Sequence, residues 1–310
     1  MSNPVRTTAR SLSDDEALAQ LLTPIGVPGS GRQRYAAAMH FNRKGQMSDA
    51  ALEVFRILSP LDAENPAGLL QARGLGAEVP VAPPMTADVA INSLIDEADR
   101  YFAGFSGAGI AELRTGLSRW RVGPVTMGKG KANGVLDTWM GPALAALTPT
   151  HPALATAIAG AVPYLDWITY DDYPRSEVGE DFATGHAFAS IFGESAAIPA
   201  LDWDMGLFLI RPDVLYRDHC HLAPELYAPL TGPHGWRFGP DRPLMIKPAH
   251  EPVWNPPNRS HLTKVGPTPF LCFFVWMRDV AQPAHIIPAR DWAKLEALQL
   301  TTPSETIRRR

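Results

Sequence analysis

Proline is spread through the whole sequence and limits the length of any helix. The chain has 30 prolines and 25 glycines among its 310 residues. Each proline lacks a backbone N–H and clashes with the preceding helical turn, so long uninterrupted helices cannot dominate the fold. Because 45% of the residues are hydrophobic and only 19% are charged, the chain still has enough apolar surface for a sizeable core. We therefore expect a globular protein with short strands and many turns in at least part of its length.

Charge and composition exclude two classes of partner. The chain has 28 basic and 32 acidic residues, a formal net charge of −4, and therefore no overall positive field to attract nucleic acid. No run of residues approaches the ~20 apolar positions that span a bilayer, so no membrane partner is expected either. Residues 1–15 lack the apolar core of a signal peptide, and the only two cysteines, Cys220 and Cys272, suit a reducing compartment. Together these features predict a cytoplasmic protein.

Helical periodicity dominates the first half of the sequence. Apolar residues recur at helical spacing within residues 14–73, and again within 89–105 and 151–162. Three prolines between residues 78 and 85 are incompatible with a helix interior and indicate an internal linker. We therefore assign residues 1–160 to a mainly α-helical N-terminal region.

The second half has the pattern of a β-rich domain. Short apolar runs alternate there with turn residues, at 188–192, 205–210, 242–247 and 270–277. The predicted fold class is therefore α+β, with a helical N-terminal region followed by a β domain over residues 161–300. The arginine-rich end, residues 301–310, reads as a solvated basic tail without a function of its own.

One stretch of twelve residues, from Tyr216 to Tyr227, carries the chemistry of the chain. Side chains two residues apart on a strand point to the same face, so His219 and His221 can present two imidazoles to one metal ion. A bend after His221 allows Glu225 and Tyr227, again two residues apart, to return to that side. This spacing of imidazoles and a carboxylate is typical of a metal site.

A further histidine is needed to complete such a site. His261 follows a tight turn in the sequence P-P-N-R-S-H, which begins at Pro256. His234 and His250 are alternatives to it. The motifs H-x-H-x-x-x-E and P-x-N-x-x-H together resemble the two metal motifs of the cupin superfamily, in which Asn258 stands where glycine is usual. Asparagine visits left-handed backbone conformations readily, so this departure is tolerable.

The longer pattern H-x-H-x-x-x-E-x-Y, with a tyrosine three residues before the first histidine, resembles the cupin-type dimethylsulfoniopropionate lyases. The resemblance implies a C-terminal β-barrel of the cupin type, a double-stranded β-helix. It also implies one divalent metal ion, with four residues of this chain as its ligands: His219, His221, Glu225 and His261. Zinc, iron, manganese and nickel all accept imidazole and carboxylate ligands, so these residues do not distinguish the metal.

The same resemblance implies a metal-dependent β-elimination that releases dimethyl sulfide and acrylate from a small carboxylate substrate. Tyr227 is then the base that removes the proton next to the carboxylate, and Tyr216 orients the substrate or assists the base. A sulfonium cation is also stabilised by aromatic faces. Four tryptophans are candidates for that contact: Trp203, Trp236, Trp254 and Trp276.

Other functions remain open at this stage. A cupin metal site also serves dioxygenases, isomerases and hydrolases, although the paired tyrosines favour elimination. A third interpretation is a non-catalytic cupin that senses a ligand, which predicts weak or absent metal binding. The helical N-terminal region either mediates homodimer formation or covers the mouth of the barrel, and the sequence contains no motif that decides between these roles.

Overall fold

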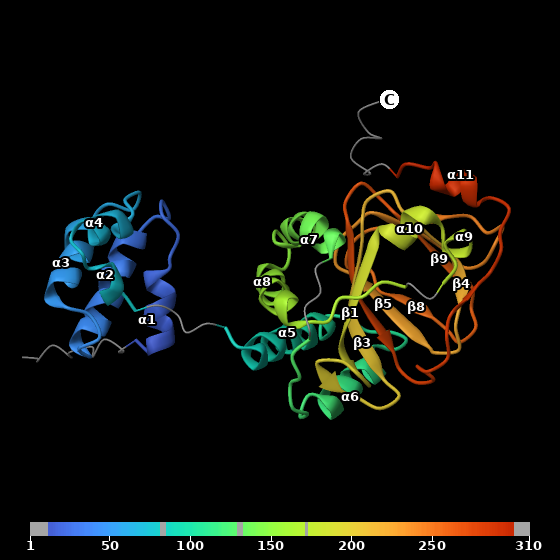
Figure 1. Cartoon of the computed structure of the whole chain (residues 1–310), viewed down its shortest axis with the longest axis horizontal. Helices are drawn as coiled ribbons and strands as arrows, with labels where there is room; N and C mark the ends of the chain where they lie inside the picture. Colours follow the sequence, from blue (N-terminus) through green and yellow to red (C-terminus); the bar gives the residue numbers. More distant parts are fainter. Residues whose placement is uncertain (1–11, 81–84, 129–132, 171–172, 301–310) are drawn as a thin grey trace, which may run out of the picture. The chain divides into compact units, whose positions relative to one another are not determined.

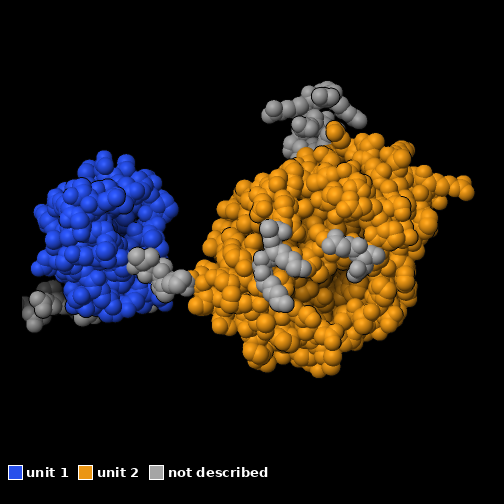
Figure 2. Space-filling model, viewed as in Figure 1, with its two compact units in different colours: residues 1–84 blue, residues 85–310 orange. Residues whose placement is uncertain are grey.

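The chain divides into two units at the proline-rich segment. The computed structural model describes residues 12–80, 85–128, 133–170 and 173–300, and its compact units are Met1–Pro84 and Met85–Arg310 (Figure 2). The division falls inside the predicted linker 78–85, of which residues 81–84 lie outside the described part. It does not fall at residue 160, where the sequence analysis placed the main boundary. The basic tail 301–310 also lies outside the described residues.

Unit 1 is a small helical bundle. Its helices are α1 (Asp14–Leu21), α2 (Ser30–Arg43), α3 (Asp49–Leu58) and α4 (Pro66–Ala72), followed by the 3-10 turn η1 (Gly76–Glu78). Ser13 and Ser48 cap α1 and α3 by accepting hydrogen bonds from the backbone N–H groups of Glu16 and Ala51. The buried side chains of Phe41, Val54 and Phe55 belong to a core that lies within this unit.

Unit 2 begins with four helices. They are α5 (Ala87–Phe102), α6 (Ile110–Trp120), α7 (Gly134–Leu147) and α8 (Pro152–Ala161), and the turn η2 (Val162–Tyr164) follows. Two short helices, α9 (Arg175–Val178) and α10 (Glu180–Thr184), precede the strands, and α11 (Trp292–Glu296) follows them. Within the described residues, no helix is both long enough and apolar enough to cross a membrane.

The strands of unit 2 form two sheets. One sheet has the order β2-β1-β3-β10-β5-β8, and the other has the order β11-β4-β9-β6-β7. The strands are β1 (His186–Gly193), β2 (Ile198–Pro199), β3 (Asp204–Ile210), β4 (Leu215–Cys220), β5 (Glu225–Pro229), β6 (His234–Arg237), β7 (Met245–Lys247), β8 (Val253–Asn255), β9 (His261–Val265), β10 (Phe270–Trp276) and β11 (His285–Ile286). The α+β class is therefore confirmed. Among the described residues the hydrogen-bonded ladders stay in two sheets, so the closed barrel remains a prediction.

One predicted strand is shorter in the structure. The sequence predicts a strand over 242–247, but β7 contains only Met245–Lys247. Pro243 explains the difference, because a proline cannot donate a hydrogen bond to a neighbouring strand.

The helices of unit 2 share one hydrophobic core with the six-stranded sheet. Alternate residues of β3 and β10, such as Leu207 and Phe273, pack in the same buried cluster as Ile95, Leu113 and Ile158 of the helices. Figure 1 shows α5 to α8 along one side of the sheets. This common core is the physical reason that the boundary lies after Pro84, because helices packed on the sheet cannot form a separate unit.

The other face of the six-stranded sheet has a different set of side chains. Phe208, Tyr227 and Phe274 lie on that face, in a second cluster that also contains Trp236 and Val265 of the five-stranded sheet. Side chains of the two sheets therefore meet between them, and the candidate site lies in this interior.

We expect Phe273→Ala to lower the free energy of unfolding of unit 2 by about 3–5 kcal/mol, the usual cost of emptying a buried phenylalanine site. Its ring is fully buried and lies 5.4 Å from that of Phe102 on α5. All eight tryptophans come after residue 85, so tryptophan fluorescence during denaturant unfolding reports on this unit alone.

Met245→Ala is the control, because that side chain is 42% exposed and should cost under about 0.5 kcal/mol. Two separate fluorescence transitions in the wild-type protein would contradict a core shared by helices and sheet.

Candidate metal centre

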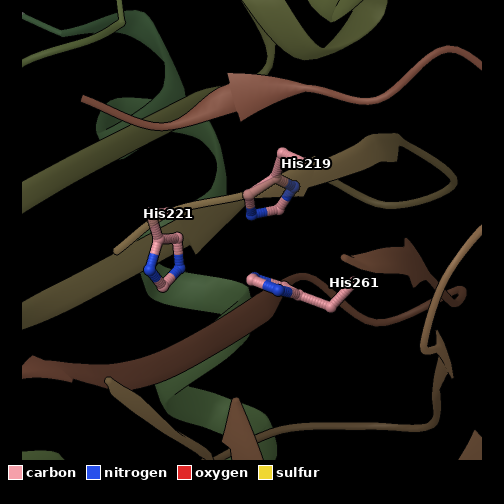
Figure 3. A group of neighbouring side chains, drawn as sticks. All are labelled: His219, His221 and His261. Atoms are coloured by element: carbon pink, nitrogen blue, oxygen red, sulfur yellow. The ribbon is translucent and has the colours of Figure 1, made fainter. Parts of the chain in front are cut away.

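Three buried histidines converge where strands β4 and β9 pair. His219 lies on β4 directly opposite His261, the first residue of β9, and His221 follows the end of β4. One nitrogen of each ring can be chosen so that all three atoms lie within 4.8 Å of one another. Figure 3 shows the three rings turned toward a shared space. This is the arrangement of three imidazole ligands around one ion.

Backbone carbonyls determine which nitrogen of each ring faces that space. The Nδ1 atoms of His219, His221 and His261 lie 2.8, 2.7 and 2.9 Å from the carbonyl oxygens of Arg217, Ala223 and Arg259. A carbonyl oxygen only accepts hydrogen bonds, so each Nδ1 carries the proton and donates it. A neutral ring then has its lone pair on Nε2. All three Nε2 atoms are therefore prepared to bind a cation, with the second nitrogen held as in known metal sites.

Glu225 brings a carboxylate to the same place. Its side chain is 2% exposed, and its Oε2 atom lies 3.2 Å from Nε2 of His221 and 3.3 Å from Nε2 of His261. Asn255 donates to Oε2 at 2.8 Å, and the indole N–H of Trp276 donates to Oε1 at 2.6 Å. These donors come from the neighbouring strands β8 and β10, so the sheet itself orients the carboxylate. The structure thus brings together all four residues that the sequence marks as ligands.

The electrostatics of the cluster suit a cation. Burial raises the pKa of Glu225, but the charge and hydrogen bond of His221 and the charge of His261 outweigh it and hold the pKa well below its ordinary range. Burial and the neighbouring His261 push the pKa of His219 well below its usual value. The Nε2 atom of His261 is buried and makes no hydrogen bond. Burial lowers the pKa of His221, but the charge and hydrogen bond of Glu225 outweigh it and raise the pKa above its ordinary value. An ionised carboxylate beside three imidazoles, which bind a metal in their neutral form, fits a divalent metal ion.

Both predicted tyrosines lie next to these residues. Tyr216, on β4, stacks on the ring of His219 with a centroid distance of 4.0 Å. Tyr227, on β5, packs edge-on against Trp236 at 5.4 Å. Burial is the main reason that the pKa of each phenol lies well above 10, and the charge of Glu225 adds to the effect. Both tyrosines are therefore neutral donors around pH 7 unless a positive charge lies beside them.

A cavity of about 160 Å³ joins these groups. It is lined by Tyr170, Tyr173, Tyr216, His219, His221, Glu225, Tyr227, Trp276 and residues 280–284. Its volume is below the ~300 Å³ at which drug-sized pockets begin, so it suits a molecule of only a few heavy atoms.

Tyr170 and Tyr173 are cavity residues that the sequence analysis missed. They lie before the sheets in the chain, and an isolated bridge between Ile168 and Phe188 brings their segment to β1. The Tyr173 hydroxyl donates to the carbonyl of Ala284 at 3.1 Å, which connects this segment to the loop on the other side of the cavity. Only a change of composition after Pro163, toward aromatic and acidic residues, marked this region in the sequence.

The four predicted tryptophans have different positions. Trp276 lines the cavity, and Trp236 is fully buried behind it, parallel to the ring of His261 at 5.9 Å. Trp203 packs against Phe192, and Trp254 packs with the helix-side core. Neither of these two lines the cavity, so the geometry gives no support to their assignment as substrate contacts. Trp254 points away because alternate residues of a strand face opposite sides, and Asn255 beside it faces the site.

The alternative histidines lie outside the three-histidine group. His250 contacts the hydroxyl of Tyr101 at 3.2 Å and that of Thr150 at 3.1 Å, next to the helices. His234 is fully buried, and neither of its ring nitrogens has a hydrogen-bond partner. Burial lowers its pKa to about 4.

Comparison with known proteins shows what part of this chain resembles. Residues 130–272 match the family model described as dimethylsulfoniopropionate lyase. No curated protein matches the chain. A solved structure of the dimethylsulfoniopropionate lyases RdDddP and RnDddQII is 18% identical, with a TM-score of 0.48, and covers 66% of this chain and 100% of its own. The lyase DddQ from Ruegeria pomeroyi is 18% identical, with a TM-score of 0.48 and coverages of 64% and 95%. A cupin-like protein from Thermotoga maritima is 12% identical, with a TM-score of 0.32 and coverages of 38% and 86%.

We expect His261→Ala to weaken binding of a divalent metal by more than about 100-fold, since even loss of a residue that supports a ligand costs about 10- to 100-fold. A competition titration with a coloured chelator measures this affinity. His234→Ala is the matched control, because it removes an equally buried imidazole outside the group. Equal losses in the two variants would contradict the assignment of His261.

His234 also predicts a pH dependence of stability. Because its pKa is about 4 in the folded chain and about 6.5 when unfolded, the unfolded state binds more protons between these values. Stability is therefore complete above pH 6.5 and falls by up to about 3 kcal/mol as pH decreases toward 4. We expect His234→Phe to flatten this part of the curve, measured by denaturant unfolding at a series of pH values. An unchanged slope would show that His234 is not the responsible group.

Proposed function

We propose that this chain, whose residues 130–272 belong to the dimethylsulfoniopropionate lyase family, cleaves dimethylsulfoniopropionate to dimethyl sulfide and acrylate by metal-dependent β-elimination. The observation that carries the proposal is one small cavity lined by His219, His221, Glu225 and both predicted tyrosines. Ligands for a cation and groups that exchange protons thus face the same volume, which is what removal of a weakly acidic proton requires.

The Nε2 atoms of His219, His221 and His261 and the carboxylate of Glu225 would hold the metal. Bound there, a divalent cation supplies the positive charge that holds the substrate carboxylate and stabilises the negative charge developing on it. Two side chains of the chain keep this site in shape. Asn255 and Trp276 each donate a hydrogen bond to Glu225, so its carboxylate remains oriented while substrate enters and product leaves.

Tyr227 is the proposed base. In the reaction its phenolic oxygen takes the proton from the carbon next to the substrate carboxylate. The electrons of the broken C–H bond form the carbon–carbon double bond of acrylate, and the pair of the broken C–S bond leaves with sulfur. Because dimethyl sulfide departs as a neutral molecule, no side chain has to protonate it. The base needs a lowered pKa, and burial acts in the opposite direction on Tyr227. A cation beside the phenol is therefore part of the proposal.

Tyr216 is proposed to position the substrate. Its ring is held between two others, stacked on Phe182 at 4.1 Å and on His219 at 4.0 Å. A phenol fixed in this way can direct its hydroxyl into the cavity with little loss of side-chain entropy on binding. The same four-ligand site also suits other reactions on small carboxylates, but four tyrosines along the cavity wall favour proton transfer over oxygen chemistry.

The proposal is tested by gas chromatography of dimethyl sulfide above the metal-loaded protein after addition of dimethylsulfoniopropionate. We expect Tyr227→Phe to reduce kcat by about 100-fold or more while the bound metal stays unchanged, since general bases contribute roughly 10²–10⁴-fold. His221→Ala should remove both the metal and the activity.

Tyr101→Phe serves as the control, because it removes a buried hydroxyl that contacts His250 and because Tyr101 does not line the cavity. A metal-loaded wild-type protein that releases no dimethyl sulfide would refute the substrate. Full activity in Tyr227→Phe would refute the base.

A further inference from the structure

A cavity of about 630 Å³ lies within unit 1, and the proposed reaction uses no residue of this unit. Small-molecule sites commonly have volumes of about 300–1,000 Å³, so this unit 1 cavity is large enough for a ligand. All four helices of the bundle contribute to its wall, through Leu21 of α1, Arg34 of α2, Phe55 of α3 and Leu70 of α4. The cavity is therefore a feature of the whole folded bundle.

The wall of the unit 1 cavity is mainly apolar and is partly open to water. Phe55 and Leu70 are 4% and 3% exposed, whereas Leu22 and Ile25 are 66% and 43% exposed. The first pair belongs to the core of the unit, and the second pair lies in the segment that follows α1. Covering exposed apolar side chains with an apolar ligand is favourable, because it removes them from water. The cavity therefore suits a ligand with an apolar chain.

Arg34 brings a positive charge to this apolar wall. Among the described residues it is the one charged residue that lines the cavity, and its side chain is only 3% exposed. Its Nη1 and Nη2 atoms donate to the backbone carbonyls of Thr23 and Asp62, at 3.0 and 3.3 Å. Thr23 also lines the cavity, so the bond to its carbonyl holds the guanidinium beside the cavity wall.

No carboxylate of the described residues forms an ion pair with Arg34. The carboxylate of Asp62 instead accepts from the backbone N–H groups of Gly29 and Gly31, at 2.7 and 2.8 Å. These two bonds lower the pKa of Asp62 more than the charge of Arg34 does. A guanidinium has five N–H groups, and a buried charge is costly unless bonds or an opposite charge compensate it. A carboxylate supplies both, since it accepts two parallel hydrogen bonds from a guanidinium.

We propose that the unit 1 cavity binds an apolar monocarboxylate, with its carboxylate on Arg34 and its hydrocarbon chain along the apolar wall. The inference goes beyond the proposed function and does not depend on the metal centre. The apolar wall selects the chain, and Arg34 selects a negative head group over a neutral or positive one. Affinity therefore rises with chain length until the cavity is filled.

The test uses two probes with the same chain and opposite charge, octanoate and octyltrimethylammonium. Isothermal titration of the metal-loaded full chain measures both affinities. We expect octanoate to bind at least about 10-fold more tightly than the cation and about 10-fold more tightly than hexanoate, which is two methylene groups shorter. No binding of octanoate, or equal binding of the two octyl probes, would overturn the inference.

The metal centre is the other place where a carboxylate can bind. His221→Ala should leave the octanoate affinity unchanged, because the proposed site belongs to unit 1. Loss of octanoate binding in this variant would place the ligand at the metal centre and overturn the inference.

Leu22→Glu locates the ligand within unit 1. It adds a negative charge at an exposed wall position and should weaken octanoate binding by at least about 10-fold. Ile57→Glu is the matched control, because Ile57 is 40% exposed on α3 and does not line the cavity. Its screened surface charge should change the affinity by less than about twofold. Equal affinities in wild type and Leu22→Glu would contradict the proposed place.

Arg34→Gln tests the head group. Glutamine still donates a hydrogen bond to the Thr23 carbonyl, so we expect this variant to fold and to lose the preference for octanoate over octyltrimethylammonium. An unchanged preference would overturn the role of Arg34. If circular dichroism shows lost helix content in Arg34→Gln, Leu22→Glu decides, because its substituted side chain is exposed.

A second copy of the chain is the alternative occupant of the exposed wall. Sedimentation of wild type and Leu22→Glu distinguishes it, and we expect the same oligomeric state for both. A wild-type dimer that Leu22→Glu dissociates, with octanoate affinity unchanged, would assign the wall to a protein contact and overturn the inference.

Discussion

Three hydrogen bonds from imidazole Nδ1–H groups to backbone carbonyls are the constraint on which the site depends. Each bond fixes one tautomer, and the three together direct the lone pairs of His219, His221 and His261 into a common space. Each carbonyl belongs to a residue two positions away from its histidine. The local backbone conformation therefore orients the three rings. A rotated ring would instead turn its Nδ1 proton toward this common space. The proposed chemistry therefore begins with backbone geometry.

Packing of the six-stranded sheet also holds the side chains of the candidate site in place. Trp276 donates to Glu225, and its ring lies 4.4 Å from that of His221 at an angle of 31°. Its neighbour Val275 faces the helix-side core. Strand β10 thus contacts both the helices and the candidate metal ligands, because its alternate residues point to opposite faces of the sheet. Movement of the helices would be transmitted to Glu225 through this strand. The common core of helices α5–α8 and the sheet is therefore part of what makes the site rigid.

Charge is distributed unevenly over the interior. Glu225 is surrounded by imidazoles and donors that keep it ionised, whereas Asp204 is buried with one oxygen unpaired. The first carboxylate lies with the histidines of the candidate metal centre, and the second is one of the residues that line a neighbouring cavity.

How much of the protein its sequence could predict depends on the range of the interactions. Local patterns were sufficient for helices such as α5 and α8, for strands such as 205–210 and for the grouping of His219, His221 and Glu225, because periodicity and short spacing act within a few residues. They did not mark α6 and α7 individually. Local prolines marked the linker 78–85, but the sequence placed the main boundary at residue 160, because only tertiary structure shows which helices pack on the sheet. Tertiary structure alone decided that Trp254 faces away, that Tyr170 lines the cavity and that Asp204 stands in line with Glu225. Strand register and packing set these positions, and both arise from contacts between residues far apart in the chain.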